Sequence, residues 1–261
     1  MSWEDFELLP VHPGWKHEFW DGTAHLSPRE RSAVARVEAR PRPVVSALPI
    51  RALTRADETE LVSAYLDAFG DTVEYCDWEP NQIDESARKT IREFYAGRRG
   101  EAHPASCLSL DPASEAASEA IAGAALLVTK KDGVPMLDVL FVRPPWQRSG
   151  LATALVSWAL NQLHREAIAV LRSRYHLANE ASRAWHRAFG FVEEPDLHLA
   201  ELYYRSAVHE LARLEKKGDL SEADHERLKA EKETWKRRVE KLEAIAREKG
   251  REAVCPSEWW D

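Results

Sequence analysis

A strand that leads through a glycine-containing loop into a helix is the feature that most constrains the fold of this chain. Residues 136–142 are nearly all apolar, which predicts a strand buried on both faces of its sheet. Two prolines at 144–145 end the strand, and Leu151, Leu155 and Trp158 then repeat at helical spacing. A strand buried on both faces needs neighbouring strands and covering helices, so this segment predicts an α/β domain.

Alternating strand and helix patterns surround this segment. Thr54 with Asp57 three residues later forms a pair like a capping box, and it predicts the start of a helix whose apolar stripe includes Leu61 and Phe69. Small residues over 111–120 predict a loop. Further strands are predicted over residues 44–50, 106–110, 121–129 and 167–171, and further helices over 82–96 and 180–189. This order predicts an α/β (α+β) fold, a mixed sheet flanked by helices.

The two ends of the chain differ in character from this central region. The pair at 21–22, Asp-Gly, predicts a tight turn between strands over 15–20 and 23–26, and residues 34–37 fit a third strand. Residues 199–249 are dense in Glu, Lys and Arg with Leu at helical spacing, and Gly218 interrupts them, which predicts an antiparallel helical hairpin. The predicted organisation is a β-hairpin extension over 1–43, a core over 44–196, a helical hairpin over 197–250 and a tail over 251–261.

Composition and charge narrow the classes of function. The 44 acidic residues outnumber the 36 basic ones, which argues against nucleic acid or an anionic membrane as the main partner. The three cysteines lie far apart, without the spacing of a zinc site or a disulfide framework. His12, His17 and His25 lack ligand-like spacing and are interpreted as packing residues, so no metal is expected. Because no signal-peptide pattern or membrane-length apolar run is present, we expect a soluble cytoplasmic protein.

The loop between the strand and the helix has the composition of an anion site. At the start of a helix several backbone N–H groups lack acceptors and lie at the positive end of the helix dipole, which suits phosphate. Arg148 adds a positive charge, and Gly150 and Ala152 leave room for a bulky pyrophosphate near the backbone. The same residues also fit an ordinary structural turn, and this segment alone does not separate the two interpretations.

Two motifs in this region resemble those of the GCN5-related N-acetyltransferases, the GNAT family. The pattern like motif A consists of Gln147, Gly150 and Ala152, preceded by Val142 and Pro144. The pattern like motif B consists of Asn179 followed by Gly190 and Phe191. Residues 50–57 also resemble the family's first strand and helix, so the resemblance covers residues 44–193.

The resemblance implies a GNAT-like sheet that splays between its fourth and fifth strands and holds acetyl-CoA, the cosubstrate, in the wedge. The pyrophosphate would bind the backbone of residues 148–153, and the pantetheine arm would pair with residues 140–142 like an added strand. Asn179 would cap its helix or orient the cofactor. The implied cofactor-binding residues are Leu140, Phe141, Val142, Gln147, Arg148, Ser149, Gly150, Leu151, Ala152, Thr153 and Asn179.

Two residues are candidates for proton transfer. Asp138 lies four residues before Val142, where members of this family often carry a carboxylate, and it would serve as the base. The alternative is that Asp138 holds a neighbouring loop or a buried arginine. His186 lies seven residues after Asn179, where the family usually has a tyrosine, and it would serve as the acid because imidazole exchanges protons at neutral pH. The alternative for His186 is a surface histidine on an amphipathic helix.

The implied activity is that of an N-acetyltransferase, in which a primary amine of a small molecule or peptide attacks acetyl-CoA directly. The alternative is a CoA-binding regulatory or interaction protein that has lost catalysis and uses the helical hairpin as its interaction surface. The histidine at position 186 and the unusual ends of the chain keep this alternative open. Asp138 and the acidic composition favour a cationic amine as the acceptor.

The segment after Phe191 is too short for the two-stranded hairpin that closes the sheet in this family. Residues 193–196 pass directly into helical spacing, which leaves room for one short strand. An open sheet edge exposes unpaired backbone groups that proteins normally cover. We therefore predict that the N-terminal hairpin over 15–26 covers this edge and walls the acceptor site, with the C-terminal helices packed outside. It would do so in the same chain or from a second copy in a homodimer.

Overall fold

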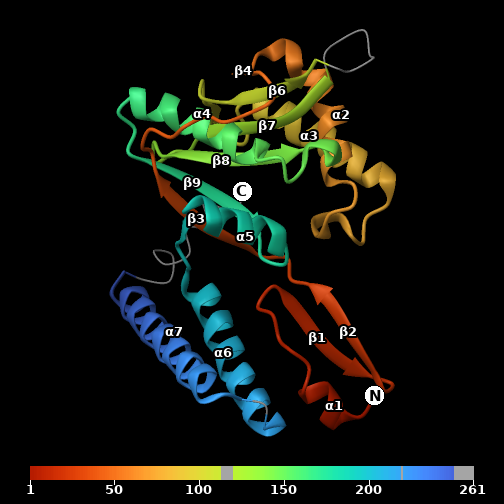
Figure 1. Cartoon of the computed structure of the whole chain (residues 1–261), viewed down its shortest axis with the longest axis vertical. Coiled ribbons are helices and arrows are strands. Elements are labelled where there is room, and N and C mark those ends of the chain that lie inside the picture. The colour runs from red at the N-terminus through yellow and green to blue at the C-terminus, as the bar shows by residue number, and fades with distance from the viewer. Residues whose placement is uncertain (113–119, 219, 250–261) are drawn as a thin grey trace. The chain divides into compact units, whose positions relative to one another are not determined.

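The computed structural model describes residues 1–112, 120–218 and 220–249 (Figure 1). The centre of the loop expected over 111–120 and the tail expected over 251–261 lie outside these ranges. The chain forms two compact units. One comprises residues 34–175 and 181–192, and is called the core unit below. The other comprises residues 1–33, 176–180 and 193 onward, and is called the terminal unit.

An eight-stranded mixed sheet organises the core unit. Its strands follow the order β10-β3-β9-β8-β7-β6-β4, and β5 pairs with β7 beside this path. The strand predicted over 44–50 is wrong except at Ile50, because the paired segment is Ile50–Ala52, and Pro49 and the prolines before it remove backbone donors from the preceding residues. The strands are β3 (Ser32–Glu38), β4 (Ile50–Ala52), β5 (Glu101–Ala102), β6 (Cys107–Asp111), β7 (Ala120–Thr129), β8 (Pro135–Val142), β9 (Val170–His176) and β10 (Val192–Glu193).

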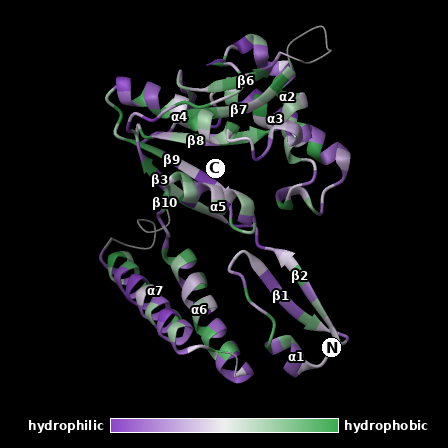
Figure 2. Cartoon of the chain, viewed as in Figure 1, coloured by the Kyte–Doolittle hydropathy of each residue, from purple (hydrophilic) through white to green (hydrophobic). Residues whose placement is uncertain are grey.

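Helices lie on opposite faces of this sheet. The ring of Phe141 on β8 contacts the rings of Tyr65 and Phe69 on α2, whereas a Cβ at Gly123, the partner of Val142, would meet Leu155 of α4. Neighbouring strand residues point to opposite faces, so α2 and α4 cover different sides. The helices are η1 (Arg55–Asp57), α2 (Glu58–Phe69), η2 (Val73–Tyr75), α3 (Pro80–Tyr95), η3 (Pro144–Trp146), α4 (Leu151–Arg165) and α5 (Glu180–Phe189). Figure 2 shows apolar residues concentrated in the central strands β6 and β7.

The predicted start of the first long helix is confirmed at atomic detail. The Asp57 carboxylate accepts a hydrogen bond of 2.8 Å from the Thr54 backbone N–H and one of 2.9 Å from its hydroxyl. Arg51 also donates to both carboxylate oxygens. The pKa of Asp57 is lowered, chiefly by the hydrogen bonds from Arg51. The capping pair therefore anchors the strand β4 to the helix that follows it.

The strand β3, not the N-terminal hairpin, lies beside β9, so our prediction that the hairpin over 15–26 covers this edge is wrong. The backbone N–H of Ala39 donates to the carbonyl of Ala169 at 2.9 Å, and that of Leu177 to the carbonyl of Arg31 at 2.7 Å, which makes the pair antiparallel. The single short strand expected after Phe191 is confirmed as β10, two residues that pair with β3. Residues 34–43 thus belong to the core unit and not to an appendage.

The terminal unit contains the predicted β-hairpin and the predicted helical hairpin. Asp21 and Gly22 have φ values of 51° and 68°, the left-handed values that a tight hairpin turn requires. The rings of Tyr203 and Trp235 pack across the helical pair at 4.4 Å, and Gly218 ends the first helix with φ 71°. None of the described helices is long and apolar enough to span a membrane. The elements are α1 (Trp3–Glu7), β1 (Trp15–Trp20), β2 (Thr23–Pro28), α6 (Leu197–Lys217) and α7 (Glu222–Lys249).

We expect the terminal unit to lose stability in acid through His17. Burial, followed by the charges of His209, Arg29 and His12, lowers the pKa of His17 below its ordinary 6.5. The unfolded chain therefore binds a proton at His17 more tightly than the folded unit does. As a result, the free energy of unfolding falls as pH drops below about 6.5 towards the folded-state pKa. Urea unfolding from about pH 7.5 to about pH 5.5 should show a shallower pH dependence in His17→Leu. His198→Gln, at an exposed position of α6, should keep the wild-type slope. Equal slopes for the two variants would contradict this expectation.

Candidate active site

A wedge opens between β8 and β9, as the predicted splayed sheet requires. The two strands are parallel and pair at Met136 with Arg172 and at Leu137 with Ser173, and their pairing ends there. On its other side β8 stays paired with β7 as far as Val142. The edge of β8 that faces β9 therefore has no strand partner over residues 138–142. An extended ligand can add to this edge as a strand would.

Asp138 lies at a bulge in the strand that borders the wedge. Val139 pairs with Leu126 and Leu137 pairs with Leu127, so Asp138 is the extra residue of β8. A bulge bends its strand and changes the direction of the side chain. The side chain of Asp138 is 1% exposed, whereas the residue as a whole is partly exposed, so its exposure comes from the main chain.

The loop after β8 presents the start of α4 with its N–H groups uncapped. The first hydrogen bond of the helix runs from Ala154 N to Gly150 O, so the N–H groups of Leu151, Ala152 and Thr153 have no acceptor among the described residues. Gly150 has φ 86°, which favours glycine, and Arg148 has φ 59°. These three N–H groups and the helix dipole are the donors and the positive potential that an anion requires.

Side chains of the loop hold it in this conformation. Gln147 Nε2 donates to the carbonyl of Val142 at 3.1 Å, and the Ser149 hydroxyl donates to that of Trp146 at 2.6 Å. The two residues therefore shape the loop by bonds to its own backbone. Trp185 Nε1 donates to the Thr153 hydroxyl at 3.2 Å and joins α5 to the first turn of α4. Trp185 was not identified from sequence, because no local pattern indicates that its helix reaches Thr153.

The Asp138 carboxylate is engaged by Arg99. Arg99 Nε and Nη2 donate to the two carboxylate oxygens at 2.5 and 3.2 Å, and Lys130 Nζ donates to the Arg99 carbonyl at 2.7 Å. Burial lowers the pKa of Arg174, and the nearby Asp138 offsets part of that shift. The contacts of Asp138 thus agree with the alternative interpretation, in which this residue is the partner of an arginine. Its role as a base stays a prediction. Arg99 was missed because it is 39 residues away in the sequence.

Replacing Asp138 by Ala should lower the free energy of unfolding by about 2–3 kcal/mol. The Arg99 guanidinium, which is only 25% exposed, then loses its carboxylate partner. Combining Asp138→Leu with Arg99→Met should recover part of this loss, because the Arg99 guanidinium is then absent, whereas Arg174 still loses the attraction of Asp138. Asp84→Ala, which breaks the exposed pair with Arg88, is the control and should have little effect. Chemical denaturation measures all three. A double variant no more stable than Asp138→Ala would refute a dominant role for the ion pair.

His186 is a core residue and not the surface histidine of the alternative interpretation. It is 5% exposed, and its ring lies among Tyr175, Trp185 and Phe191. Its Nδ1 lies 2.7 Å from the carbonyl of Ser182, which can only accept, so Nδ1 carries the proton. Nε2 lies 2.8 Å from the Ser173 hydroxyl, which can donate to it or accept from it. This geometry favours a structural role, and the predicted acid role stays untested.

The His186→Phe variant separates the two roles. If the role is structural, the variant should lose about 1–3 kcal/mol of stability, because the Ser173 hydroxyl and the Ser182 carbonyl lose their buried partner. Its kcat per folded molecule should stay close to that of the wild type. Thermal denaturation and steady-state kinetics on the same preparation provide both values. A lower kcat at unchanged stability would instead support His186 as the acid.

Asn179 immediately precedes α5, as the motif predicts. Its backbone N–H donates to the carbonyl of His176 at 2.9 Å, within the turn that connects β9 to α5. Its assignment to the cofactor stays a prediction. In the described part of the chain, no three His, Cys, Asp or Glu side chains form a group that could hold a metal ion.

The splayed sheet, the edge of β8 without a strand partner and the uncapped start of α4 define an α/β protein with main-chain donors along one strand edge and at one helix start. The chain belongs to the acetyltransferase (GNAT) family, whose sequence pattern it matches over residues 61–191. This confirms the resemblance found in the motifs and makes the protein an acetyltransferase. A search of curated protein sequences found no match.

Several solved acetyltransferase structures are similar to this chain. The PaiA N-acetyltransferase from Thermoplasma acidophilum, solved with coenzyme A, is 14% identical, and the alignment covers 57% of this chain and 92% of that one at a TM-score of 0.47. The ribosomal-protein-S18-alanine N-acetyltransferase from Escherichia coli is 20% identical, with 56% and 79% covered at a TM-score of 0.40. A GCN5-related N-acetyltransferase from Sphaerobacter thermophilus is 21% identical, with 62% and 48% covered at 0.41.

Proposed function

We propose that the protein transfers an acetyl group from acetyl-CoA to a primary amine by direct attack of the amine on the thioester. The observation that carries this proposal is the continuity between the edge of β8 that has no strand partner over 138–142 and the uncapped N-terminus of α4. The first offers main-chain groups to the amide-containing pantetheine arm. The second offers N–H donors to a pyrophosphate. One ligand that needs both is coenzyme A.

In the proposed reaction the nitrogen lone pair of the neutral amine forms a bond to the thioester carbonyl carbon, and the C–S bond breaks. The amine loses a proton, and the CoA thiolate gains one. Asp138 and His186 remain the candidates for these transfers. The contact of Asp138 with Arg99 and the contacts of His186 with Ser173 and Ser182 nevertheless favour structural roles. We therefore assign the main contribution of the chain to orientation, in which the acetyl group is fixed at the wedge for the incoming amine.

The proposal is tested by measuring CoA release from acetyl-CoA with a panel of amines. Polyamines, aminoglycosides and peptides with free amino termini cover the cationic acceptors that the sequence favours. Amine-dependent CoA release would support acetyl transfer. Tight binding of acetyl-CoA without release for any amine would favour the alternative, a CoA-binding protein that has lost catalysis. The cytoplasmic location, the homodimer and the exclusion of nucleic acid and membrane partners stay predictions.

A further inference from the structure

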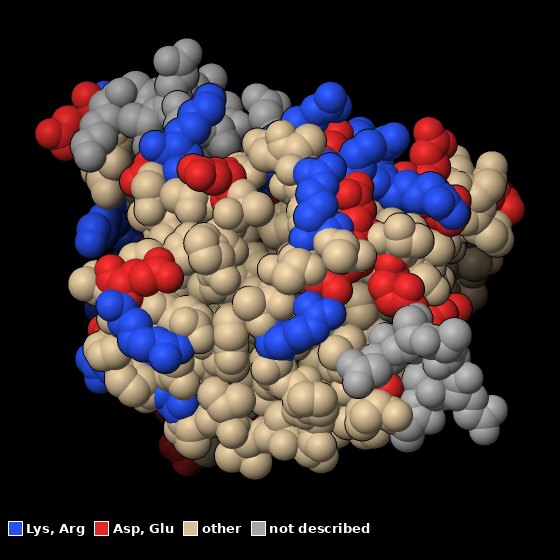
Figure 3. All heavy atoms as spheres, turned by 90° about the horizontal axis from the view of Figure 1, so that it is seen from above, with Lys and Arg blue, Asp and Glu red and all other residues tan. Residues whose placement is uncertain are grey.

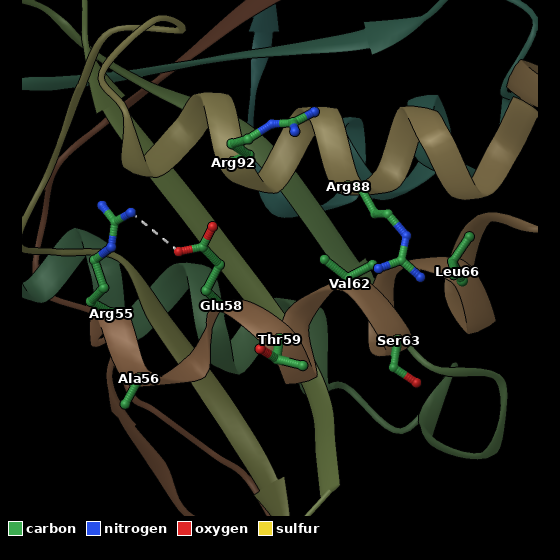
Figure 4. A pocket seen from close by; sticks show the side chains of 9 residues that line it. All are labelled: Arg55, Ala56, Glu58, Thr59, Val62, Ser63, Leu66, Arg88 and Arg92. Atoms are coloured by element: carbon green, nitrogen blue, oxygen red, sulfur yellow. Dashed lines mark ion pairs between the residues drawn. The ribbon is translucent and has the colours of Figure 1, made fainter.

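A pocket between α2 and α3 lies outside the features assigned to acetyl transfer. Its volume is about 670 Å³, within the range of ligand sites. Arg55 and Glu58 approach it from the chain around the start of α2, and Arg88 from α3 projects towards α2 on the other side (Figure 4). None of these residues belongs to the wedge or to the start of α4. The pocket is therefore a separate candidate site of the core unit.

The lining of this pocket is rich in arginine, although the protein is acidic overall. Arg55, Arg88 and Arg92 line it together with a single carboxylate, that of Glu58, while the whole chain has a net charge of −8. On the face of the molecule drawn in Figure 3, basic and acidic side chains are interspersed. A local surplus of guanidinium groups attracts carboxylates, which guanidinium binds in a fixed geometry.

Two of the three arginines already contact carboxylates, one of them Glu58 in the lining and the other Asp84 outside it. Arg55 Nη2 lies 3.4 Å from Glu58 Oε2, and Arg88 donates from Nε and Nη2 to both oxygens of Asp84. The Arg92 guanidinium, in contrast, has no hydrogen bond or ion pair within the described residues. The hydroxyls of Thr59 and Ser63 on α2 are likewise without a described partner. Donors for an additional acceptor group are thus present on both helices.

The lining of the pocket also includes apolar side chains. Val62 and Leu66 of α2 contribute partly exposed aliphatic side chains between the polar groups. We propose that this α2–α3 pocket binds an acidic, partly apolar peptide segment of another protein. The segment's carboxylates would pair with Arg55 and Arg92, and its aliphatic side chains would contact Val62 and Leu66. Charge complementarity and the spread of the arginines, with Arg55 in η1 and Arg88 and Arg92 on α3, favour a segment with several carboxylates.

Fluorescence anisotropy of the full chain with a fluorescein-labelled octapeptide of Glu and Leu tests the proposal, and it requires no acetyl transfer. The matched probe replaces each Glu by Gln. Arg92→Gln and Arg55→Gln should each weaken binding of the acidic peptide by about three-fold, the scale of an exposed ion pair. Lys89→Gln removes a neighbouring charge of α3 that does not line the pocket, and it should leave binding unchanged. Glu58→Gln should strengthen binding, since it removes the carboxylate that competes for Arg55.

Three results would overturn the proposal. The first is equal binding of the Glu and Gln peptides, which would exclude recognition of charge. The second is an equal effect of Arg92→Gln and Lys89→Gln, which would show that the protein's general charge and not the pocket is responsible. The third is tighter binding of a single-stranded oligonucleotide than of the acidic peptide, which would assign the arginines to phosphate. All substituted side chains are exposed or partly exposed, so the variants should fold, and circular dichroism checks this.

Discussion

Ala152→Asp should weaken the binding of acetyl-CoA by roughly a hundred-fold, the equivalent of about 3 kcal/mol. Ala152 is the second residue of α4, and its N–H is one of the three that have no described acceptor. A carboxylate there would compete with the pyrophosphate for hydrogen bonds from these N–H groups, and its negative charge would repel the pyrophosphate. The same carboxylate should stabilise the helix itself, because a negative charge in the first turn interacts favourably with the dipole. Calorimetric titration measures the affinity, and thermal denaturation measures the stability.

Asn81→Asp is the matched control for this variant. Asn81 is the second residue of α3 and is exposed, so the substitution adds the same charge at the same position of another helix in the core unit. We expect it to leave the affinity for acetyl-CoA unchanged. Unchanged affinity in Ala152→Asp would exclude the start of α4 as the pyrophosphate site. Equal losses in both variants would show that the added net charge, and not its place, is responsible.

Deleting residues 1–38 should abolish the cooperative unfolding of the core unit, whereas deleting residues 1–28 should leave it. The longer deletion removes β3, which lies between β9 and β10 in the sheet and buries Ala33, Ala35 and Val37. Without β3 the backbone groups along β9 lose their partners, and apolar surface of the sheet is exposed to water. The shorter deletion removes α1 and the hairpin β1–β2, which forms a sheet of its own.

Circular dichroism during thermal unfolding, together with acetyl-CoA titration, distinguishes these outcomes. A protein lacking residues 1–38 that unfolds cooperatively and binds acetyl-CoA as the full chain does would show that β3 is dispensable. Loss of the core transition already on deletion of residues 1–28 would indicate instead that the hairpin β1–β2 supports the core, as the strand-like, aromatic sequence of residues 15–26 suggested.

Patterns that depend on neighbouring residues could be predicted from the sequence. The capping pair Thr54 and Asp57, the helix that ends at Gly190 and the turn at Gly22 each depend on interactions within a few residues. The same holds for the start of α4, because unpaired N–H groups and a glycine with positive φ are properties of one turn of chain. The motif residues around Gly150 were therefore sufficient to indicate the candidate cofactor site and its family.

Contacts between distant parts of the chain were decided by the tertiary structure alone. The pairing of Asp138 with Arg99, the burial of His186 against Ser173 and the insertion of β3 beside β9 join residues that no local spacing relates. Residues 32–38 have the same strand-forming pattern whether they extend a hairpin or enter a larger sheet, since alternation specifies a strand and not its neighbour. Which edge such a strand occupies depends on the apolar surface and the unpaired backbone that the rest of the fold leaves exposed.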